Sequence, residues 1–137
     1  MDRMEDTRRN YNELNNRLEV AMMTGNVLLL NNERDIKHAL GYVASAIGSD
    51  KSGEEIFRMA LQYSDTNKTE IAGLSTSRVY GDPCINVILR DKDSDFHLDN
   101  EDGVLCYVFN AKQDDYSELG YCFFEKRTSG NTYHRIG

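Results

Sequence analysis

The spacing of apolar residues along the chain changes from a helical period in the front half to short, β-rich runs in the back half. Near the start, apolar residues recur at intervals of three and four, at Tyr11, Leu14, Leu18 and Ala21 or Met22. Arginines and asparagines occupy many of the positions between them. This pattern is typical of an amphipathic helix, and Gly25 marks its expected end.

Two further helices are predicted after the short apolar run at 27–30. For the second, Asn31 or Asn32 can cap the N-terminus, and acidic residues in the first turn favour the helix dipole. Its apolar stripe consists of Ile36, Ala39, Leu40, Val43, Ala44 and Ile47, and Gly48 ends it. For the third, Ser52 precedes an apolar side made of Ile56, Met59, Ala60 and Tyr63. The front half therefore predicts three short helices.

After the turn "YGDP", the pattern favours β-strands at 84–90, 104–110, 119–127 and 132–136. Clusters of glycine, aspartate, asparagine and serine separate these runs, and "TSGN" between the last two is typical of a tight hairpin. Residues 68–80 are ambiguous between a helix and an additional edge strand.

These elements predict an α+β fold. We expect three short N-terminal helices packed on one face of a three- to five-stranded, mostly antiparallel C-terminal sheet. The length is that of one domain over residues 1–137, with the helical part at about 1–66 and the sheet at about 76–137.

The predicted strands carry apolar residues on both sides. Three short helices cover only one face of such a sheet. We therefore expect part of the other face to contact a partner, most simply a second copy of the chain in a homodimer. The residues predicted for this oligomer interface are Leu105, Tyr107, Phe109 and Phe124. The alternative is that loops and the segment 68–80 cover that face.

Composition favours a folded protein of the cytoplasm. Hydrophobic residues make up 39% of the chain, with eight tyrosines and five phenylalanines, which is unlike a disordered sequence. The sequence contains no apolar stretch of the ~18 to 20 residues that cross a bilayer, and the N-terminus lacks the apolar core of a secretory signal. Three cysteines, Cys84, Cys106 and Cys122, lie among apolar neighbours, which favours buried, reduced thiols.

Charge is distributed unevenly. Residues 91–118 hold nine acidic and two basic residues and therefore account for the whole net charge of −7, because the rest of the chain has fourteen of each. The densest stretch, "RDKDSDFHLDNEDG" at 90–103, resembles a calcium loop in the spacing of its aspartates. The strict positions of an EF-hand do not match, because Phe96 replaces the glycine of the sharp turn and the flanks are predicted strands.

No catalytic motif accompanies this charge. The sequence contains no GxSxG, P-loop or GxGxxG pattern, and the three histidines are not spaced as metal ligands. We therefore expect no catalytic residue, no metal and no cofactor. The net negative charge also disfavours direct binding of nucleic acid.

The sequence is best interpreted as a non-enzymatic intracellular binding or inhibitory protein that recognises a basic protein surface, for example on a nucleic-acid-handling protein. The predicted partner-binding residues are Asp91, Asp93, Asp95, Asp99, Glu101, Asp102, Asp114, Asp115 and Glu118. Small acidic inhibitors of this kind occur among phage and mobile-element counter-defence proteins, an analogy of size and charge alone. Two alternatives stay open: a domain that binds a small molecule or a divalent ion, and an enzyme without a recognisable motif. The acidic loops have a further interpretation, in which their charge serves solubility and not recognition.

Overall fold

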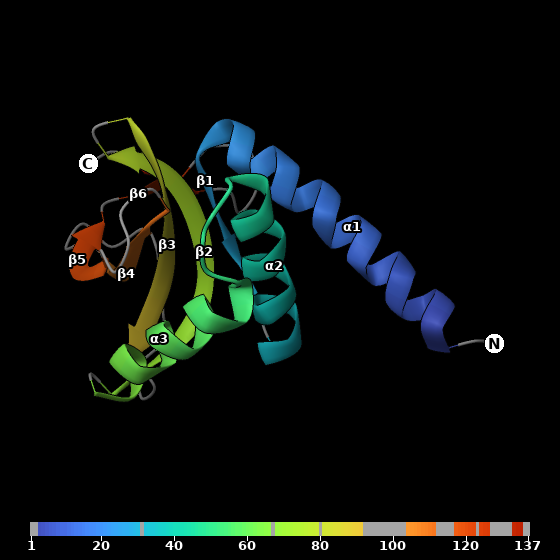
Figure 1. Cartoon of the computed structure of the whole chain (residues 1–137), viewed down its shortest axis with the longest axis horizontal. Helices are drawn as coiled ribbons and strands as arrows, with labels where there is room; N and C mark the ends of the chain where they lie inside the picture. Colours follow the sequence, from blue (N-terminus) through green and yellow to red (C-terminus); the bar gives the residue numbers. More distant parts are fainter. Residues whose placement is uncertain are drawn as a thin grey trace.

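The computed structural model describes residues 3–30, 32–66, 68–79, 81–91, 104–111, 117–122, 124–126 and 133–135. In chain order, the elements are α1 (Arg3–Thr24), β1 (Asn26–Leu29), α2 (Glu33–Ala46), α3 (Gly53–Thr66), β2 (Thr69–Val79), β3 (Asp82–Asp91), β4 (Val104–Asn110), β5 (Ser117–Cys122), β6 (Phe124–Lys126) and β7 (Tyr133–Arg135). The helices occupy the front of the chain and the sheet is antiparallel (Figure 1). The predicted α+β class is confirmed.

Four of the helix ends lie where the sequence places their caps. Asn32 accepts a hydrogen bond from the backbone N–H of Asp35 at 2.8 Å and so caps α2. Ser52 does the same for α3 through the N–H of Glu55 at 3.2 Å. Gly25 and Gly48 follow α1 and α2 with positive φ angles of 70° and 72°, as expected for residues that end helices.

The strands form one sheet in the order β5-β4-β3-β2-β1-β7-β6. The ambiguous segment is a strand: β2 pairs with β3 along its length, from Thr69 opposite Asp91 to Val79 opposite Asp82. The sheet has seven strands among the described residues, more than the expected three to five, for two reasons. The apolar run at 27–30 contributes most of β1, and the expected strand at 119–127 is divided into β5 and β6.

The sheet curves back on itself. β5 and β6 are its outermost strands, yet a single residue separates the end of β5 from the start of β6. Since consecutive Cα atoms are about 3.8 Å apart, the two edges approach within about 8 Å there. Seven strands in a flat sheet, spaced about 4.8 Å apart, would hold their outermost strands about 29 Å apart. The sheet is therefore strongly curved.

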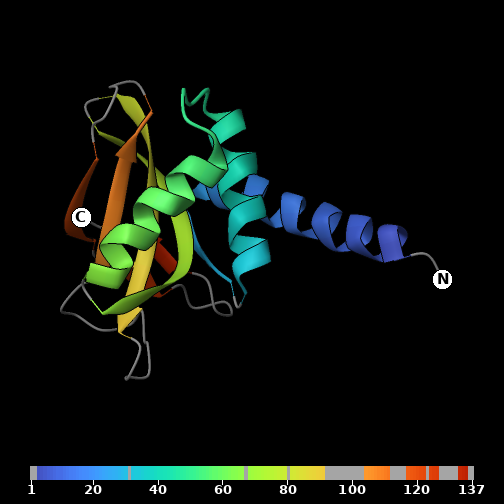
Figure 2. The same cartoon turned by 60° about the horizontal axis from the view of Figure 1, so that its bottom comes forward.

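One face of the sheet and the three helices share the main core. Leu74 of β2, Val87 of β3 and Tyr107 of β4 are buried together with residues of all three helices. The helix residues of this core include Leu14, Leu18, Leu40, Val43, Ile56 and Ala60. In Figure 2, α3 crosses the sheet and α2 lies beside it.

The core includes two residues for which the sequence predicted a different role. Tyr107 and Phe109 are 0% and 2% exposed, and the Tyr107 ring lies 4.9 Å from that of Tyr63 in α3. These two side chains are therefore unavailable for a contact between two copies, because this alternating set of β4 faces the helices. The side chains of the other two predicted contacts, Leu105 and Phe124, lie outside the described part.

The opposite face of the sheet is buried as well. Cys84, Asn86 and Ile88 of β3 and Cys106 of β4 are all fully buried. The polar member of this group, Asn86, donates hydrogen bonds to the hydroxyl oxygens of Ser75 and Ser77, each at 3.1 Å. The second face is thus covered within one chain over these strands.

Helices α2 and α3 pack at very short range. Gly53, the first residue of α3, is buried, and a Cβ placed on it would overlap the backbone of Gly41 and Leu40 in α2. Only glycine allows this approach. The crossing fixes the position of α3 and therefore of the side chains that α3 directs toward the sheet end described below.

Candidate functional site

The acidic residues predicted to bind a partner are attached to the ends of central strands. Asp91 ends β3, and Glu118 lies in β5. The other seven, Asp93, Asp95, Asp99, Glu101, Asp102, Asp114 and Asp115, lie outside the described residues. Residues 91–103, here called the acidic segment, join the neighbouring strands β3 and β4.

The strand order places the two acidic connections at opposite ends of the sheet. β3, β4 and β5 are consecutive antiparallel neighbours. The acidic segment therefore starts and ends at one end of these strands, and the connection from β4 to β5 starts and ends at the other. Each end carries its own concentration of negative charge.

A hollow of about 330 Å³ lies at the end of the sheet from which the acidic segment starts. We call it the α3–β2 hollow. Its lining comes from the connection between β1 and α2, from the start of α2, from α3 and from the adjoining ends of β2 and β3: Leu30, Asn32, Glu33, Ile36, Phe57, Leu61, Ser64, Asp65, Thr69, Glu70, Ile71 and Arg90. Arg90 immediately precedes Asp91, so the hollow and the acidic segment are continuous along the chain.

The charged groups of this hollow are three carboxylates and one guanidinium. Arg90 is already paired, because its Nε lies 2.5 Å from Oε1 of Glu70. Asp65 is exposed at the end of α3. Glu33 lies 3.3 Å from the ammonium of Lys37, and that ammonium lies 5.2 Å from the centre of the Phe57 ring. The rim therefore already holds one cation between a carboxylate and an aromatic face, and with Lys37 counted its three carboxylates and two cations leave a net charge of −1.

The floor of the hollow is held by a reciprocal pair of hydrogen bonds. The Ser64 hydroxyl donates to the carbonyl of Thr69 at 2.6 Å, and the Thr69 hydroxyl donates to the carbonyl of Ser64 at 3.2 Å. Both residues are buried. This clamp joins the last turns of α3 to the start of β2, so the apolar and acidic side chains of the hollow are carried by a rigid frame.

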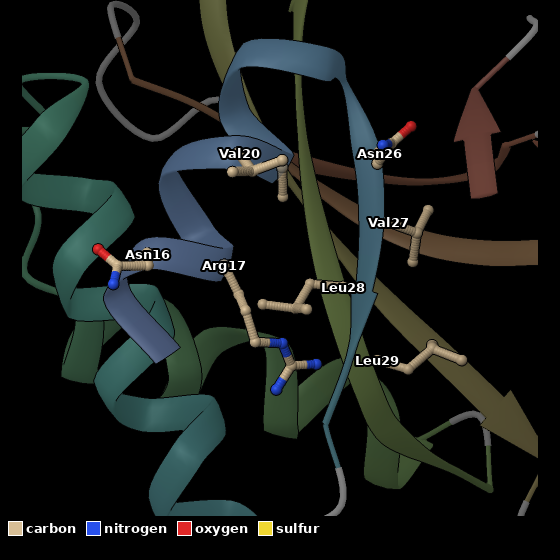
Figure 3. A pocket seen from close by; sticks show the side chains of 8 residues that line it. Asn16, Arg17, Val20, Asn26, Val27, Leu28 and Leu29 are labelled. Atoms are coloured by element: carbon tan, nitrogen blue, oxygen red, sulfur yellow. The ribbon is translucent and has the colours of Figure 1, made fainter. Parts of the chain in front are cut away.

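A larger groove of about 620 Å³ lies between α1 and β1 (Figure 3). Leu28 extends from β1 toward α1, whereas Val27 and Leu29 extend to the other side of the strand (Figure 3). Arg17 is the single charged residue among the described residues that line this groove. Val20 and Leu29, which also line it, are 57% and 37% exposed. The groove is therefore apolar with a positive charge, opposite in sign to the α3–β2 hollow.

The chain matches no protein-family model, and no curated protein or solved structure is significantly similar to it. Its function has to be inferred from its own residues.

A polar seam joins α1 to α2. Tyr11 stacks on His38 with ring centres 4.1 Å apart, and Nε2 of His38 lies 2.6 Å from Oδ1 of Asn15. Burial lowers the pKa of His38, and the nearby carboxylate of Asp35 partly opposes this by raising it. One turn on, the hydroxyl of Tyr42 donates to Glu19 at 2.5 Å, and this hydrogen bond raises the pKa of Tyr42. The seam anchors α1, whose N-terminal end extends away from the rest of the fold (Figures 1 and 2).

The described residues contain no group of three histidine, cysteine or acidic side chains that could hold a metal ion. Cys84 and Cys106 are reduced thiols, fully buried in the sheet, which agrees with the expectation for these two cysteines. No helix within the described ranges is long and apolar enough to cross a membrane.

The α3–β2 hollow was not anticipated from the sequence. The predicted stripe of α3 included Met59 and Tyr63, which are only partly buried, and omitted Phe57, which is 4% exposed. Phe57 and Leu61 are four residues apart and adjoin the stripe on the helix surface, so the apolar side of this helix is wider than a core contact requires. That extra pair was the available signal. The acidic wall of the hollow depends on the pairing of β2 with β3, which local periodicity does not provide.

Proposed function

We propose that the protein is a non-enzymatic binding protein of the cytoplasm that recognises, and by occupying it inhibits, a basic surface on another protein. A nucleic-acid-handling protein fits this description, because its phosphate-binding surface is rich in lysine and arginine. An acidic competitor bound there would exclude the nucleic acid.

The observation that carries this proposal is the segregation of charge. The whole net charge of −7 belongs to residues 91–118, and the remaining residues balance. β3 and β4, which flank the acidic segment, are among the most deeply buried strands of the fold. Solubility alone is served by charges spread over the surface. Charges collected on the connections of a sheet instead produce a directed field at each end, and the stronger one belongs to the acidic segment, with six acidic residues and one basic residue.

A directed field acts on the rate of association and on the choice of partner. Clustered charges steer an oppositely charged protein and raise its association rate by roughly 10- to 1,000-fold. Between exposed groups, this attraction is screened over about 8–10 Å at physiological salt. Partner binding should therefore weaken strongly as salt is raised, whereas a contact made by apolar surfaces alone would change little.

The test is partner capture from the native host with the wild-type protein and with a variant that carries Asp91→Asn, Asp93→Asn, Asp95→Asn and Asp99→Asn. We expect a basic protein to be captured by the wild type, released by salt and lost with the variant. The control variant removes four acidic charges from another region through Asp2→Asn, Glu5→Gln, Asp6→Asn and Glu13→Gln. A partner set that is the same for the wild type and the first variant would refute the proposal.

A further inference from the structure

We propose that the α3–β2 hollow receives an apolar side chain of the partner that stands next to a lysine or arginine. This inference rests on the proposed function, because it specifies what kind of basic segment the acidic end of the sheet accepts. It adds a specific contact to the long-range attraction.

Two features of the hollow fit such a segment, its apolar walls and its charged rim. Phe57 and Ile71 are apolar walls, and Leu61, which is 38% exposed, leaves apolar surface open to solvent at the hollow. A volume of about 330 Å³ is near the lower end of the roughly 300–1,000 Å³ typical of ligand pockets. The hollow therefore has room for a side chain rather than for a large ligand.

The second feature that fits such a segment is the charged rim of the hollow. The Lys37 ammonium already lies between the carboxylate of Glu33 and the ring of Phe57, and Arg90 is paired with Glu70. Among the described lining residues, Asp65 is therefore the carboxylate that is left for a partner cation. Asp65 borders the same hollow, and the acidic segment begins beside it at Asp91. A partner arginine or lysine next to the inserted side chain would have the exposed carboxylate of Asp65 within reach.

Charge also distinguishes this hollow from the larger groove. The α1–β1 groove offers more space and comparable exposed leucine surface, but its charged lining residue is Arg17. At the α3–β2 hollow, three carboxylates face the two cations Arg90 and Lys37, which leaves a net charge of −1. A basic segment is therefore repelled at the α1–β1 groove and attracted at the α3–β2 hollow. The larger of the two spaces is thus the less suitable one for this partner.

The probes are two labelled peptides that differ at one position, GRRLRRG and GRRGRRG, measured by fluorescence anisotropy. We expect the leucine peptide to bind the wild type about fivefold or more tightly than the glycine peptide, as burial of part of a leucine side chain predicts. Leu61→Ser should remove this difference. Leu29→Ser is the matched control, because Leu29 has nearly the same exposure (37% against 38%) and lines the other groove.

Three results would overturn the inference: equal binding of the two peptides, no binding of either, or an equal loss with Leu29→Ser. Amide chemical shifts of the wild type titrated with the leucine peptide give an independent measurement, which should place the largest changes at Phe57, Ser64 and Ile71. The variant with four Asp→Asn substitutions separates the two proposals. If it loses both peptides while Leu61→Ser changes neither, the acidic segment binds basic chains and the hollow does not; if it loses neither peptide, the electrostatic function itself is refuted.

Discussion

The close crossing of α2 and α3 allows a prediction in which two glycine substitutions have opposite signs. In Gly53→Ala, the new methyl group overlaps the backbone of Gly41 and Leu40. Those backbone atoms cannot rotate away as a side chain can, so the two helices must separate. In Gly41→Ala, by contrast, the added Cβ meets no atom within 4 Å. The same chemical change is therefore tested on the two sides of one contact.

The magnitudes follow from packing and from helix propensity. Forcing an extra methyl group into a packed contact costs roughly 1–3 kcal/mol, and an overlap with backbone belongs in the upper half of that range. Alanine in place of glycine inside a helix stabilises by about 0.5–1 kcal/mol. For a chain of 137 residues, 1 kcal/mol corresponds to about 3–5 °C in Tm. We expect Tm to fall by about 6–15 °C for Gly53→Ala and to rise by about 2–5 °C for Gly41→Ala.

Thermal and urea unfolding followed by circular dichroism measures both variants against the wild type. Equal midpoints and urea slopes for Gly53→Ala and the wild type would contradict the described crossing. A destabilised Gly41→Ala would show that the space beside that residue is filled. Because α3 carries Phe57, Leu61 and Asp65, Gly53→Ala should also weaken binding of the leucine peptide even where the protein stays folded.

The remaining predictions concern the α1–α2 seam, the anchoring of α1 and the cysteines. The pKa of His38 is lower in the folded chain than its ordinary value of 6.5. Its contribution to stability is therefore full above about pH 6.5 and is lost as the pH falls below that value toward the folded pKa. The free energy of unfolding, measured in urea at pH 7 and pH 5.5, should fall less between these pH values for His38→Gln than for the wild type. Leu18→Ala should lower the free energy of unfolding by about 2–5 kcal/mol, because Leu18 is 1% exposed. Val20→Ala, at a residue that is 57% exposed, should change it by less than about 0.5 kcal/mol. Similar values for the two variants would argue against the described buried face of α1. With Cys84 and Cys106 fully buried, at most one of the three thiols should react with a thiol reagent under native conditions and all three in denaturant, and rapid reaction of two would contradict this burial.

Local sequence signals predicted the elements well. Asn32, Ser52, Gly25 and Gly48 mark helix ends through hydrogen bonds and φ angles that depend on neighbouring residues alone. The strands β3 and β4 were visible because buried strands are near-continuous apolar runs. β1 was visible as an apolar run but was not assigned as a strand, since four residues between two helices carry no period.

The sequence did not reveal which face of each strand the helices cover. A run such as Val104 to Asn110 is apolar on both sides, so its alternation does not reveal which side the helices cover. The prediction placed Tyr107 and Phe109 at a partner surface, and they are core residues. The curvature of the sheet depends on the direct passage from β5 to β6, which brings its two edges together. That is a property of the whole topology.

One part of the candidate site was predictable from the sequence and the other part was not. The acidic segment was visible from composition alone, because charge can be counted along the chain. The α3–β2 hollow depends on long-range neighbours: Glu70 and Arg90 are paired across β2 and β3, and the Ser64–Thr69 clamp fixes α3 against the start of β2. Glu70 and Asp65 are unremarkable in the sequence and become part of a site only through these contacts.

The central claim is that the acidic segment binds a basic protein, and the most direct test compares partner capture by the wild type and by the variant with Asn at 91, 93, 95 and 99. Quantitative mass spectrometry of both captures, at about 50 and 200 mM salt, measures the effect of the charges and of screening together. The account predicts a basic protein that is enriched by the wild type, reduced at the higher salt and lost with the variant, but retained by the variant with four N-terminal charges removed. A partner held equally by the wild type and the acidic-segment variant at both salt concentrations would contradict it.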